Sequence, residues 1–328
     1  MSFDVSHRQP GILRAHYALL PIVALSILLL LPYDCSAQSP GQKLSETELS
    51  LYAKAHPYVD ESLDKLEKQI PELKKIKPAK DQQELPVILE KTADTVDAFF
   101  HSVVDLIADE QITQARLSRR GVVVSSDQVR VNYLILRQGD PGSYRIVEYR
   151  MDSAGKPMDQ VGAQAGYVVT FGFALDCDYF ASPFQSESRF RYLGEQKLGE
   201  HDTYVVAFAQ KPEQASLFVT LSGSNGKSAS MLMQGVAWID KSNYQIIRVR
   251  SDLLAPHPEI DLDRQTTEVT FAKVELQDAA TPLWLPERVK VSVAFRSAHD
   301  PFGISYENEH SYTDYRRYRV SVKMLTPK

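Results

Sequence analysis

The chain has 328 residues, of which 43% are hydrophobic and 24% are charged. This balance is typical of a globular protein and excludes wholesale disorder. The formal net charge of -5, from 37 basic and 42 acidic residues, excludes the dominant basic surface by which proteins bind nucleic acids.

The first 37 residues have the pattern of a signal peptide. An apolar run from Leu19 to Leu31 is shorter than the ~20 residues of a transmembrane helix. Small residues follow it, so we predict cleavage after Ala37 and a periplasmic location. The alternatives are an uncleaved anchor and a lipid anchor at Cys35. After cleavage Cys177 is the one remaining cysteine, which excludes an internal disulfide and favours a bacterial periplasm.

A helical extension is predicted next. Ser45 and Glu48 match a capping box. Apolar residues then recur at three- and four-residue steps, which predicts one amphipathic helix that bends at Pro57. From Lys68 to Pro86 lysine, proline and glutamine are frequent, which predicts a solvated linker or a frayed helix end.

The strongest helix pattern runs from Leu85 to Ile107. Pro86 suits the first turn, and no glycine interrupts the run. The apolar stripe of this helix is wide, so we expect it to lie against a sheet.

After Ala108 the apolar pattern changes to a period of two, which predicts strands. Their connections have hairpin length, and strands do not alternate with helices, so the sheet is predicted to be antiparallel. Residues 153–187 fit either a buried strand or a helix. The predicted strands are Gln111–Ser118, Val129–Gln138, Tyr144–Asp152, Arg189–Leu198, Thr203–Gln210, Leu217–Leu221, Gln234–Ile239, Tyr244–Arg250, Thr266–Leu276, Leu283–Phe295 and Tyr306–Lys323.

Alternation within one strand indicates which face is buried. Val289, Val291 and Val293 point to one side, whereas Lys290 and Ser292 point to the other. One apolar face therefore needs a cover, and the long helix supplies it. The predicted fold class is α+β, with a large curved antiparallel sheet around an apolar helix and an N-terminal helical extension.

The sequence contains no recognisable catalytic, metal or cofactor motif. The histidines lack zinc-ligand spacing, and there is neither a nucleophile elbow nor a glycine-rich phosphate loop. Asp176 and Asp178 flank Cys177 and would raise its pKa, which disfavours a nucleophilic role. His201 and His299 lie in predicted turns, where they are expected to cap local backbone. We predict a non-catalytic protein that needs no cofactor.

Aromatic residues are the most informative candidates for a binding site. Any one of them is first expected in the core, but together they are also suited to lining a pocket for an apolar ligand. In the last strand, tyrosines and arginines predict either an exposed contact surface or, as we favour, an edge strand protected by charge. The candidate lining residues are Phe99, Phe100, Val103, Phe171, Phe173, Trp238 and Trp284.

Two late motifs and one earlier segment resemble the outer-membrane lipoprotein-sorting superfamily, which includes the lipoprotein carrier, its receptor and a periplasmic stress sensor. The matching segments are Gly235–Asp240 followed by Gln245–Val249, Leu283–Pro286, and Gly194–Gly199 followed by Thr203–Val206. The resemblance covers roughly residues 86–323. It implies a half-barrel of antiparallel strands around helices, with an apolar cavity for acyl chains.

The predicted domain order is signal peptide 1–37, helical extension and linker 38–85, and half-barrel domain 86–328, and the extension is a departure from the family pattern. The favoured function is carrier-like binding of a lipid or lipoprotein acyl chain, with peripheral membrane contact. The alternatives are a non-catalytic interaction or sensor module of the envelope and a hydrolase with an unrecognised site. The ligand, the partner and the oligomeric state remain open.

Overall fold

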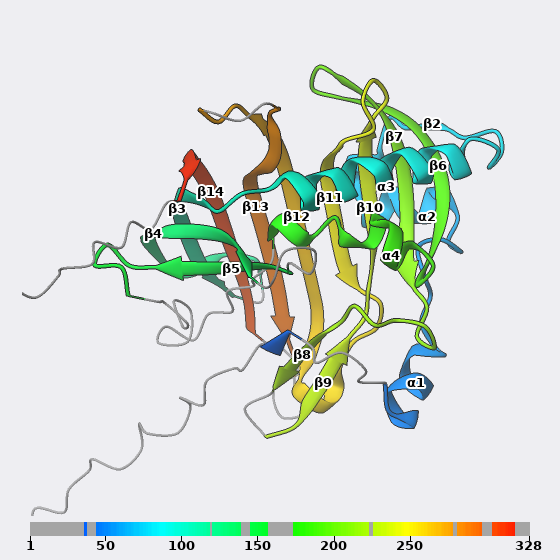
Figure 1. Cartoon of the computed structure of the whole chain (residues 1–328). Helices are drawn as coiled ribbons and strands as arrows, with labels where there is room; N and C mark the ends of the chain where they lie inside the picture. The colour runs from blue at the N-terminus through cyan, green and yellow to red at the C-terminus, as the bar shows by residue number, and fades with distance from the viewer. Residues whose placement is uncertain are drawn as a thin grey trace, which may run out of the picture. The chain divides into compact units, whose positions relative to one another are not determined.

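An eleven-stranded antiparallel sheet forms the main structure of the protein (Figure 1). The computed structural model describes residues 36–37, 44–118, 120–138, 145–156, 173–222, 226–277, 281–296 and 304–318. The predicted signal peptide, apart from residues 36 and 37, lies outside the described residues. Phe171 and His299 also lie outside them.

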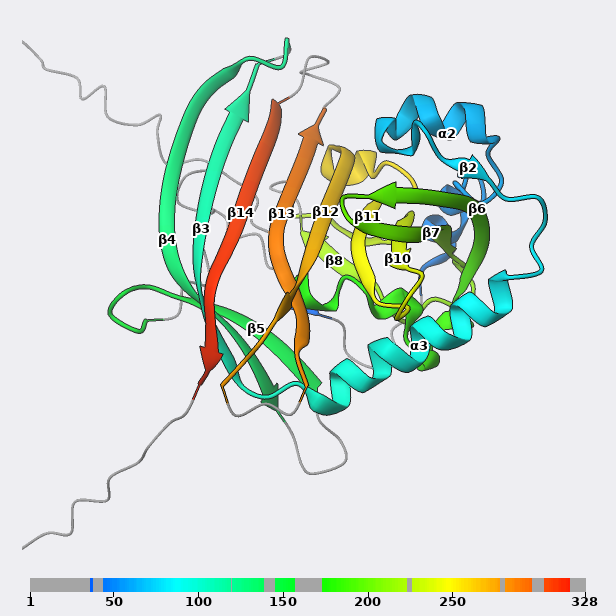
Figure 2. The ribbon, with the colours of Figure 1, turned by 90° about the horizontal axis from the view of Figure 1, so that it is seen from above.

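The strand order in this sheet is β2-β6-β7-β10-β11-β12-β13-β14-β3-β4-β5. Each neighbouring pair is antiparallel, and the two end strands do not pair with each other. Figure 2 shows the sheet curving around α3, so the predicted α+β half-barrel is confirmed. The strands are β2 (Lys77–Pro78), β3 (Leu106–Leu117), β4 (Val123–Gln138), β5 (Arg145–Met151), β6 (Ser188–Leu198), β7 (His201–Gln210), β10 (Met233–Asp240), β11 (Ile246–Leu253), β12 (Leu262–Val274), β13 (Leu283–Phe295) and β14 (Ile304–Arg317).

A second, three-stranded sheet has the order β1-β8-β9. Its strands are β1 (Ser36–Ala37), β8 (Val219–Ser222) and β9 (Ser228–Met231). The sequence predicted β8 but missed β9, whose short run of Ser, Ala and Met carries little strand signal.

The long helix α3 (Leu85–Ser102) ends earlier than predicted. Val103 is extended, and Leu106 and Ile107 pair with β4 as the first residues of β3. The predicted end at Ile107 was wrong because apolar residues at these positions satisfy both the helical and the strand period.

The N-terminal extension is broken into α1 (Glu46–Tyr52), α2 (Leu63–Gln69) and the 3-10 turn η1 (Pro71–Leu73). The predicted capping box is present, because Glu48 N donates to Ser45 and Ser45 N donates to Glu48. The prediction of one continuous helix was wrong, because residues 53–62 are not helical and include Pro57.

The predicted solvated linker is also wrong in its central part. Lys77 and Pro78 form the edge strand β2, which pairs with Glu195 and Gly194 of β6. A Cβ atom on Gly194 would lie 2.1 Å from the Lys77 carbonyl oxygen. Glycine therefore permits this close approach of the two backbones.

The sheet separates two hydrophobic clusters. The inner cluster, on the concave side, includes α3 residues and one side of most strands. The outer cluster joins the extension to the other side of β6, β7, β10 and β11. In β10 Val236 and Trp238 face the outer cluster, while Ala237 and Ile239 face the inner one. A single buried face is thus a correct prediction for β13 but not for these four strands.

Residues 173–185 form neither a strand nor a long helix. They contain the 3-10 turns η3 (Phe173–Leu175) and η4 (Asp178–Phe180) and the short helix α4 (Ser182–Gln185). We call Phe173–Gln185 the inner segment. In the part of the chain that the structure describes, no helix is long and apolar enough to cross a membrane.

Candidate functional site

The inner segment lies beside α3 on the concave side of the sheet (Figures 1 and 2). α3 contacts η4 and α4, and β13 contacts η3. The strands present apolar side chains to the concave side by period-two alternation, as Val289, Val291 and Val293 of β13 do. The candidate site is this apolar space between α3 and the half-barrel.

Aromatic rings of the inner segment fill much of that space. Phe173 and Phe180 are buried. Tyr179 stacks on Phe208 of β7 with ring centroids 4.7 Å apart, and Phe180 packs against Phe190 of β6 at 5.2 Å. These contacts bring apolar rings to the place that a bound hydrophobic ligand would require.

Four hydrogen bonds tie the inner segment to its neighbours. They run from Ala174 N to Glu148 Oε1 at 3.1 Å, from Ser251 Oγ to Asp176 Oδ2 at 2.9 Å, from Ser182 N to Asp97 Oδ1 at 3.2 Å, and from Gln185 Nε2 to Leu89 O at 2.8 Å. Two of them reach α3 and two reach the sheet. Three have a carboxylate as the acceptor, so the charge of those groups affects how the segment is held.

A buried ionic cluster lies at the β3–β4–β5–β14 end of the inner face. The Arg150 guanidinium donates to both oxygens of Glu110, at 2.7 and 2.8 Å, and neither side chain is exposed. Arg150 also lies 5.4 Å from the ring centroid of Phe173 and 5.5 Å from that of Tyr133. His310 Nδ1 contacts Glu110 at 2.7 Å. Burial alone would raise the pKa of Glu110, but Arg150 and His310 lower it to about 2.

Three further carboxyl groups near this cluster have the opposite behaviour. Burial raises the pKa of Glu148 to about 7, although Tyr133 donates a hydrogen bond to it. Burial likewise raises the pKa of Asp176 to about 7. Burial, followed by the charges of Glu148 and Asp176, raises the pKa of Asp178 well above its ordinary value. Among the described residues Asp178 Oδ1 has no hydrogen-bond partner.

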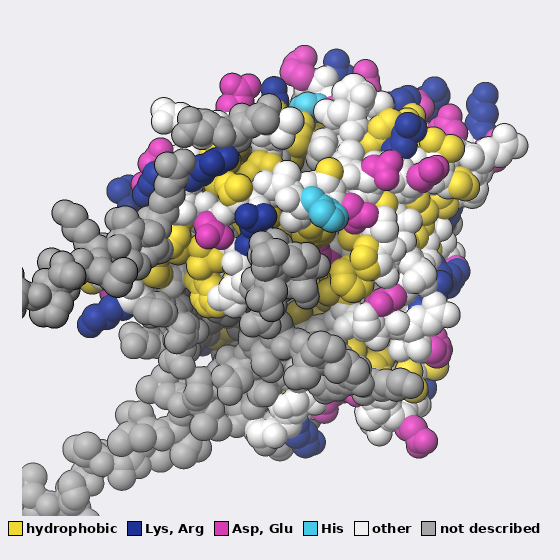
Figure 3. Space-filling model, viewed as in Figure 1, with side chains coloured by type: hydrophobic (Ala, Val, Ile, Leu, Met, Phe, Trp, Pro, Cys, Tyr) yellow, Lys and Arg dark blue, Asp and Glu magenta, His cyan; other side chains and the backbone are white. Residues whose placement is uncertain are grey.

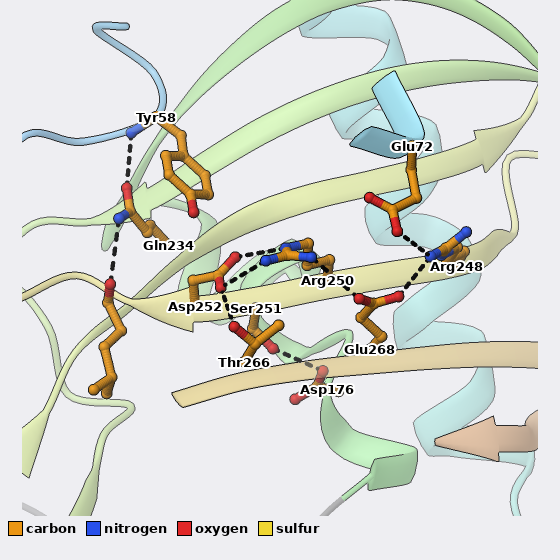
Figure 4. A network of polar contacts seen from close by, with 11 residues as sticks. Tyr58, Glu72, Asp176, Gln234, Arg248, Arg250, Ser251, Asp252, Thr266 and Glu268 are labelled. Carbon is orange, nitrogen blue, oxygen red and sulfur yellow. Dashed lines mark hydrogen bonds and ion pairs between the residues drawn. The ribbon is translucent and has the colours of Figure 1, made fainter. Parts of the chain in front are cut away.

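The outer face carries a different polar network (Figure 4). Arg248 and Arg250 of β11 both pair with Glu268 of β12, at 2.5 and 3.1 Å. Arg250 also binds Asp252 at 2.8 Å. Figure 4 shows Ser251, between these residues, reaching Asp176 on the other side of the strand. β11 therefore connects the inner segment to the charged outer network.

The structure divides the predicted lining residues. Phe99 and Phe100 are partly buried against the inner cluster, and Val103 and Phe173 belong to it. Trp238 faces the outer cluster, where its indole N–H donates to Gln196. Half-buried Trp284 contacts both clusters. Strand alternation alone does not tell which side of a doubly buried sheet faces the helix, so sequence reasoning grouped residues that lie on opposite faces.

The two late motifs meet at an outer groove of about 1400 Å³. Here Asp240 hydrogen bonds to His201 Nδ1, and the rings of His201 and Trp284 lie 6.0 Å apart. The expectation that His201 caps local backbone was therefore wrong, because its partner comes from β10. Within the described residues no group of three or more His, Cys, Asp or Glu side chains is arranged to hold a metal ion.

Sequence reasoning missed the ionic cluster. The favoured edge-strand interpretation of the last strand was wrong, because β14 lies between β13 and β3. His310 and Tyr312 are consequently buried, and both contact Glu110. Their spacing of two residues placed them on one face, but their partners on β3 and β5 are distant in sequence.

No protein-family model matches the chain, and no curated protein matches it. Three similar solved structures are a DUF1329 family protein from Desulfovibrio piger (TM-score 0.36, 11% identity, 73% of this chain and 94% of that chain covered), a putative outer membrane lipoprotein-sorting protein domain from Vibrio parahaemolyticus (0.34, 13%, 72% and 95%), and a LolA superfamily protein from Nitrosomonas europaea (0.31, 15%, 74% and 97%). At TM-scores of 0.31 to 0.36 and identities of 11% to 15%, these likenesses carry no conclusion about the function of this chain.

Proposed function

We propose that this protein is an exported periplasmic protein that binds an apolar ligand, a lipid or a lipoprotein acyl chain, on the inner face of its half-barrel. It acts as a carrier and catalyses no reaction. The observation that supports this most is the inner face, on which a short irregular segment packs against both an apolar helix and an apolar concave sheet.

The ligand is proposed to lie along α3 and the facing strands. Phe99, Phe100 and Val103 of α3 would contact it in the space that Phe173 of the inner segment occupies in this structure, and half-buried Trp284 would lie at its edge. Trp238 faces the other side of the sheet and is left out. Figure 3 shows hydrophobic side chains reaching the surface near α3, which offers an apolar approach to this space.

Export and binding are tested on protein recovered from the periplasm. N-terminal sequencing is expected to begin at Gln38, directly after the predicted cleavage site. Native mass spectrometry and lipid extraction are expected to find bound lipid. A fluorescent fatty acid is expected to bind, and Phe100→Asp is expected to weaken it at least about tenfold, because a charge in an apolar site is costly.

The matched control is Val87→Asp, on the same helix but 47% exposed, which is expected to leave probe binding unchanged. Recovery of lipid-free protein that also fails to bind the probe would contradict the carrier function.

A second candidate function is contact with a protein partner in the envelope. One observation favours it: Val122, Val123 and Val124 at the β3–β4 hairpin are 62%, 55% and 62% exposed. Consecutive exposed valines often mark an interaction surface. Photo-crosslinking from position 123 in cells is expected to give one discrete adduct, which Val124→Lys removes and Val219→Lys does not. No adduct, or an adduct insensitive to Val124→Lys, would contradict this candidate.

A further inference from the structure

The inner segment is tightly packed and yet weakly ordered by its own backbone. Phe173 and Phe180 are buried, but the segment contains only two 3-10 turns of three residues and one four-residue helix. Such short elements gain little stability from internal hydrogen bonds. The segment therefore depends on contacts with the surrounding layers to hold its position.

Those contacts include a local excess of acidic groups. Asp176 and Asp178 belong to the segment, and Glu148 of β5 accepts the hydrogen bond from Ala174 N. Arg150 is the neighbouring cation, and Glu110 binds it through two hydrogen bonds. Among the described residues, the other titratable groups that face this region are Glu110 of β3, Tyr133 of β4, His310, Tyr312 and Tyr315 of β14, Cys177 and Tyr179 of the segment and Asp97 of α3.

Three carboxylates that become charged here would repel one another, and burial would withhold water from them. Ser251 can donate one hydrogen bond to Asp176. Asp178 Oδ1 has no partner among the described residues. Outward movement of the segment would reduce this repulsion and return both aspartates to water, because Asp176 and Asp178 belong to the segment.

We propose that the inner segment is an autoinhibitory occupant of the ligand space, retained while Glu148, Asp176 and Asp178 are neutral and displaced when they become charged. That an apolar ligand then takes its place rests on the proposed function. The displacement itself does not depend on any ligand.

The direction of the pH dependence follows from linkage. Burial raises the pKa of Glu148 and of Asp176 to about 7 in the packed state, whereas a solvated carboxyl group titrates near pH ~4. The packed state thus binds more protons between these values. Each such group shifts the equilibrium toward the displaced state by up to about tenfold per pH unit over this range. The contribution of these groups to packing is therefore complete below about pH 4 and is lost as the pH rises through about 7.

Cys177 is a built-in reporter of this movement, because it lies on the segment and is 8% exposed. The full chain contains only one other cysteine, Cys35, so the chain with Cys35→Ser reports from a single thiol. We would measure its reaction with 4,4′-dithiodipyridine and divide the rate of urea-unfolded protein by that of native protein at each pH. This ratio removes the ordinary pH dependence of thiol reactivity.

The ratio is expected to fall at least about tenfold between pH 5 and pH 7. Asp176→Asn combined with Asp178→Asn is expected to reduce the fall strongly, because a neutral amide mimics the protonated acid and only Glu148 is left to become charged. Glu148→Gln provides a second, independent variant and is expected to reduce the slope. The control is Asp94→Asn, an exposed residue of α3, which is expected to reproduce the wild-type slope.

A constant ratio from pH 5 to pH 8 in the parent protein would overturn the proposal, as would an unchanged slope in the double variant. Fluorescent fatty-acid binding at the same pH values separates this result from the function. A falling ratio without fatty-acid binding would support displacement of the segment and contradict the carrier function. Fatty-acid binding with a constant ratio would support the carrier function and contradict displacement.

Discussion

The two faces of the sheet solve the burial of charge in different ways. On the outer face Arg248 and Arg250 meet Glu268 and Asp252, so each buried or half-buried charge has an opposite partner. On the inner face Asp178 has an oxygen without a partner among the described residues. Glu110, by contrast, is matched there by buried Arg150 and by buried His310. From this contrast we expect the outer layer to stay in place and the packing of the inner segment to depend on the charge of its carboxyl groups.

The largest expected loss of stability comes from a substitution in the outer hydrophobic cluster. Trp238 has no exposed surface, and its indole N–H donates to Gln196 at 2.8 Å. Trp238→Ala is expected to lower the free energy of unfolding by about 3–5 kcal/mol, because it opens a large cavity. Urea denaturation measures this loss. Half-buried Trp284→Ala should cost less, and an equal or smaller loss at Trp238 would contradict a fixed outer layer.

The second prediction concerns pH and the inner face. The pKa of Asp176 is raised to about 7, above its unfolded value, so its stabilising contribution is complete below about pH 4 and is lost as the pH rises through about 7. Asp176→Asn is expected to stabilise the protein at pH 8 by roughly 2–3 kcal/mol, less than the full shift because Asp176 is partly exposed. At pH 4 this gain should disappear.

Thermal unfolding at both pH values measures this difference. Outer-face Asp252→Asn is the contrasting variant. It removes a partner of Arg250 and is therefore expected to destabilise the protein at pH 8. Stabilisation by both substitutions would remove the distinction between the two faces.

Sequence periodicity predicted the antiparallel sheet and the covering helix, because both depend on local alternation of apolar residues. It matched β13, Leu283–Phe295, at both ends. Sequence periodicity failed where the same apolar residues fit two different structures or two different faces. Leu106 and Ile107 suit a helix and a strand equally, and β10 is apolar on both sides.

The ionic part of the site was beyond this reasoning because its members come from separate strands. Glu110, Arg150 and His310 meet only when β14 pairs with β3 and β4 pairs with both β3 and β5. No local spacing encodes that meeting. By contrast, the acidic pair around Cys177 is visible in the sequence, and its effect on the thiol has the predicted direction. Burial and then the two aspartates raise the pKa of Cys177 well above its ordinary value.

A smaller loss of stability is expected from a substitution at Gly235, where the backbones of β10 and β11 approach closely. A Cβ atom on Gly235 would lie 2.0 Å from the Arg250 carbonyl oxygen and 2.7 Å from the Phe208 ring. Gly235→Ala is expected to destabilise the protein by about 1–3 kcal/mol, because β10 and β11 must separate. Urea denaturation measures it.

Gly199→Ala is the control for that substitution. Its Cβ atom would meet open space, but its φ is +59°, so only the conformational cost remains, about 1 kcal/mol. A greater loss at Gly199 than at Gly235 would show that the strand approach is not the limiting contact.

The smallest effect is expected at the rim of the outer layer, where the extension meets β6. Asp60 pairs with Arg189, and their side chains are 48% and 51% exposed. Solvent screens such a pair, so Asp60→Asn is expected to change the free energy of unfolding by less than about 1 kcal/mol. In 1 M salt the variant and the parent protein are expected to be equally stable. The apolar contacts of Leu66, Ile70 and Leu73 with the sheet, rather than this charge pair, then hold the extension in place. A loss of stability as large as that of Trp238→Ala would contradict this view. It would show that the ion pair, rather than the apolar contacts, holds the extension against the sheet.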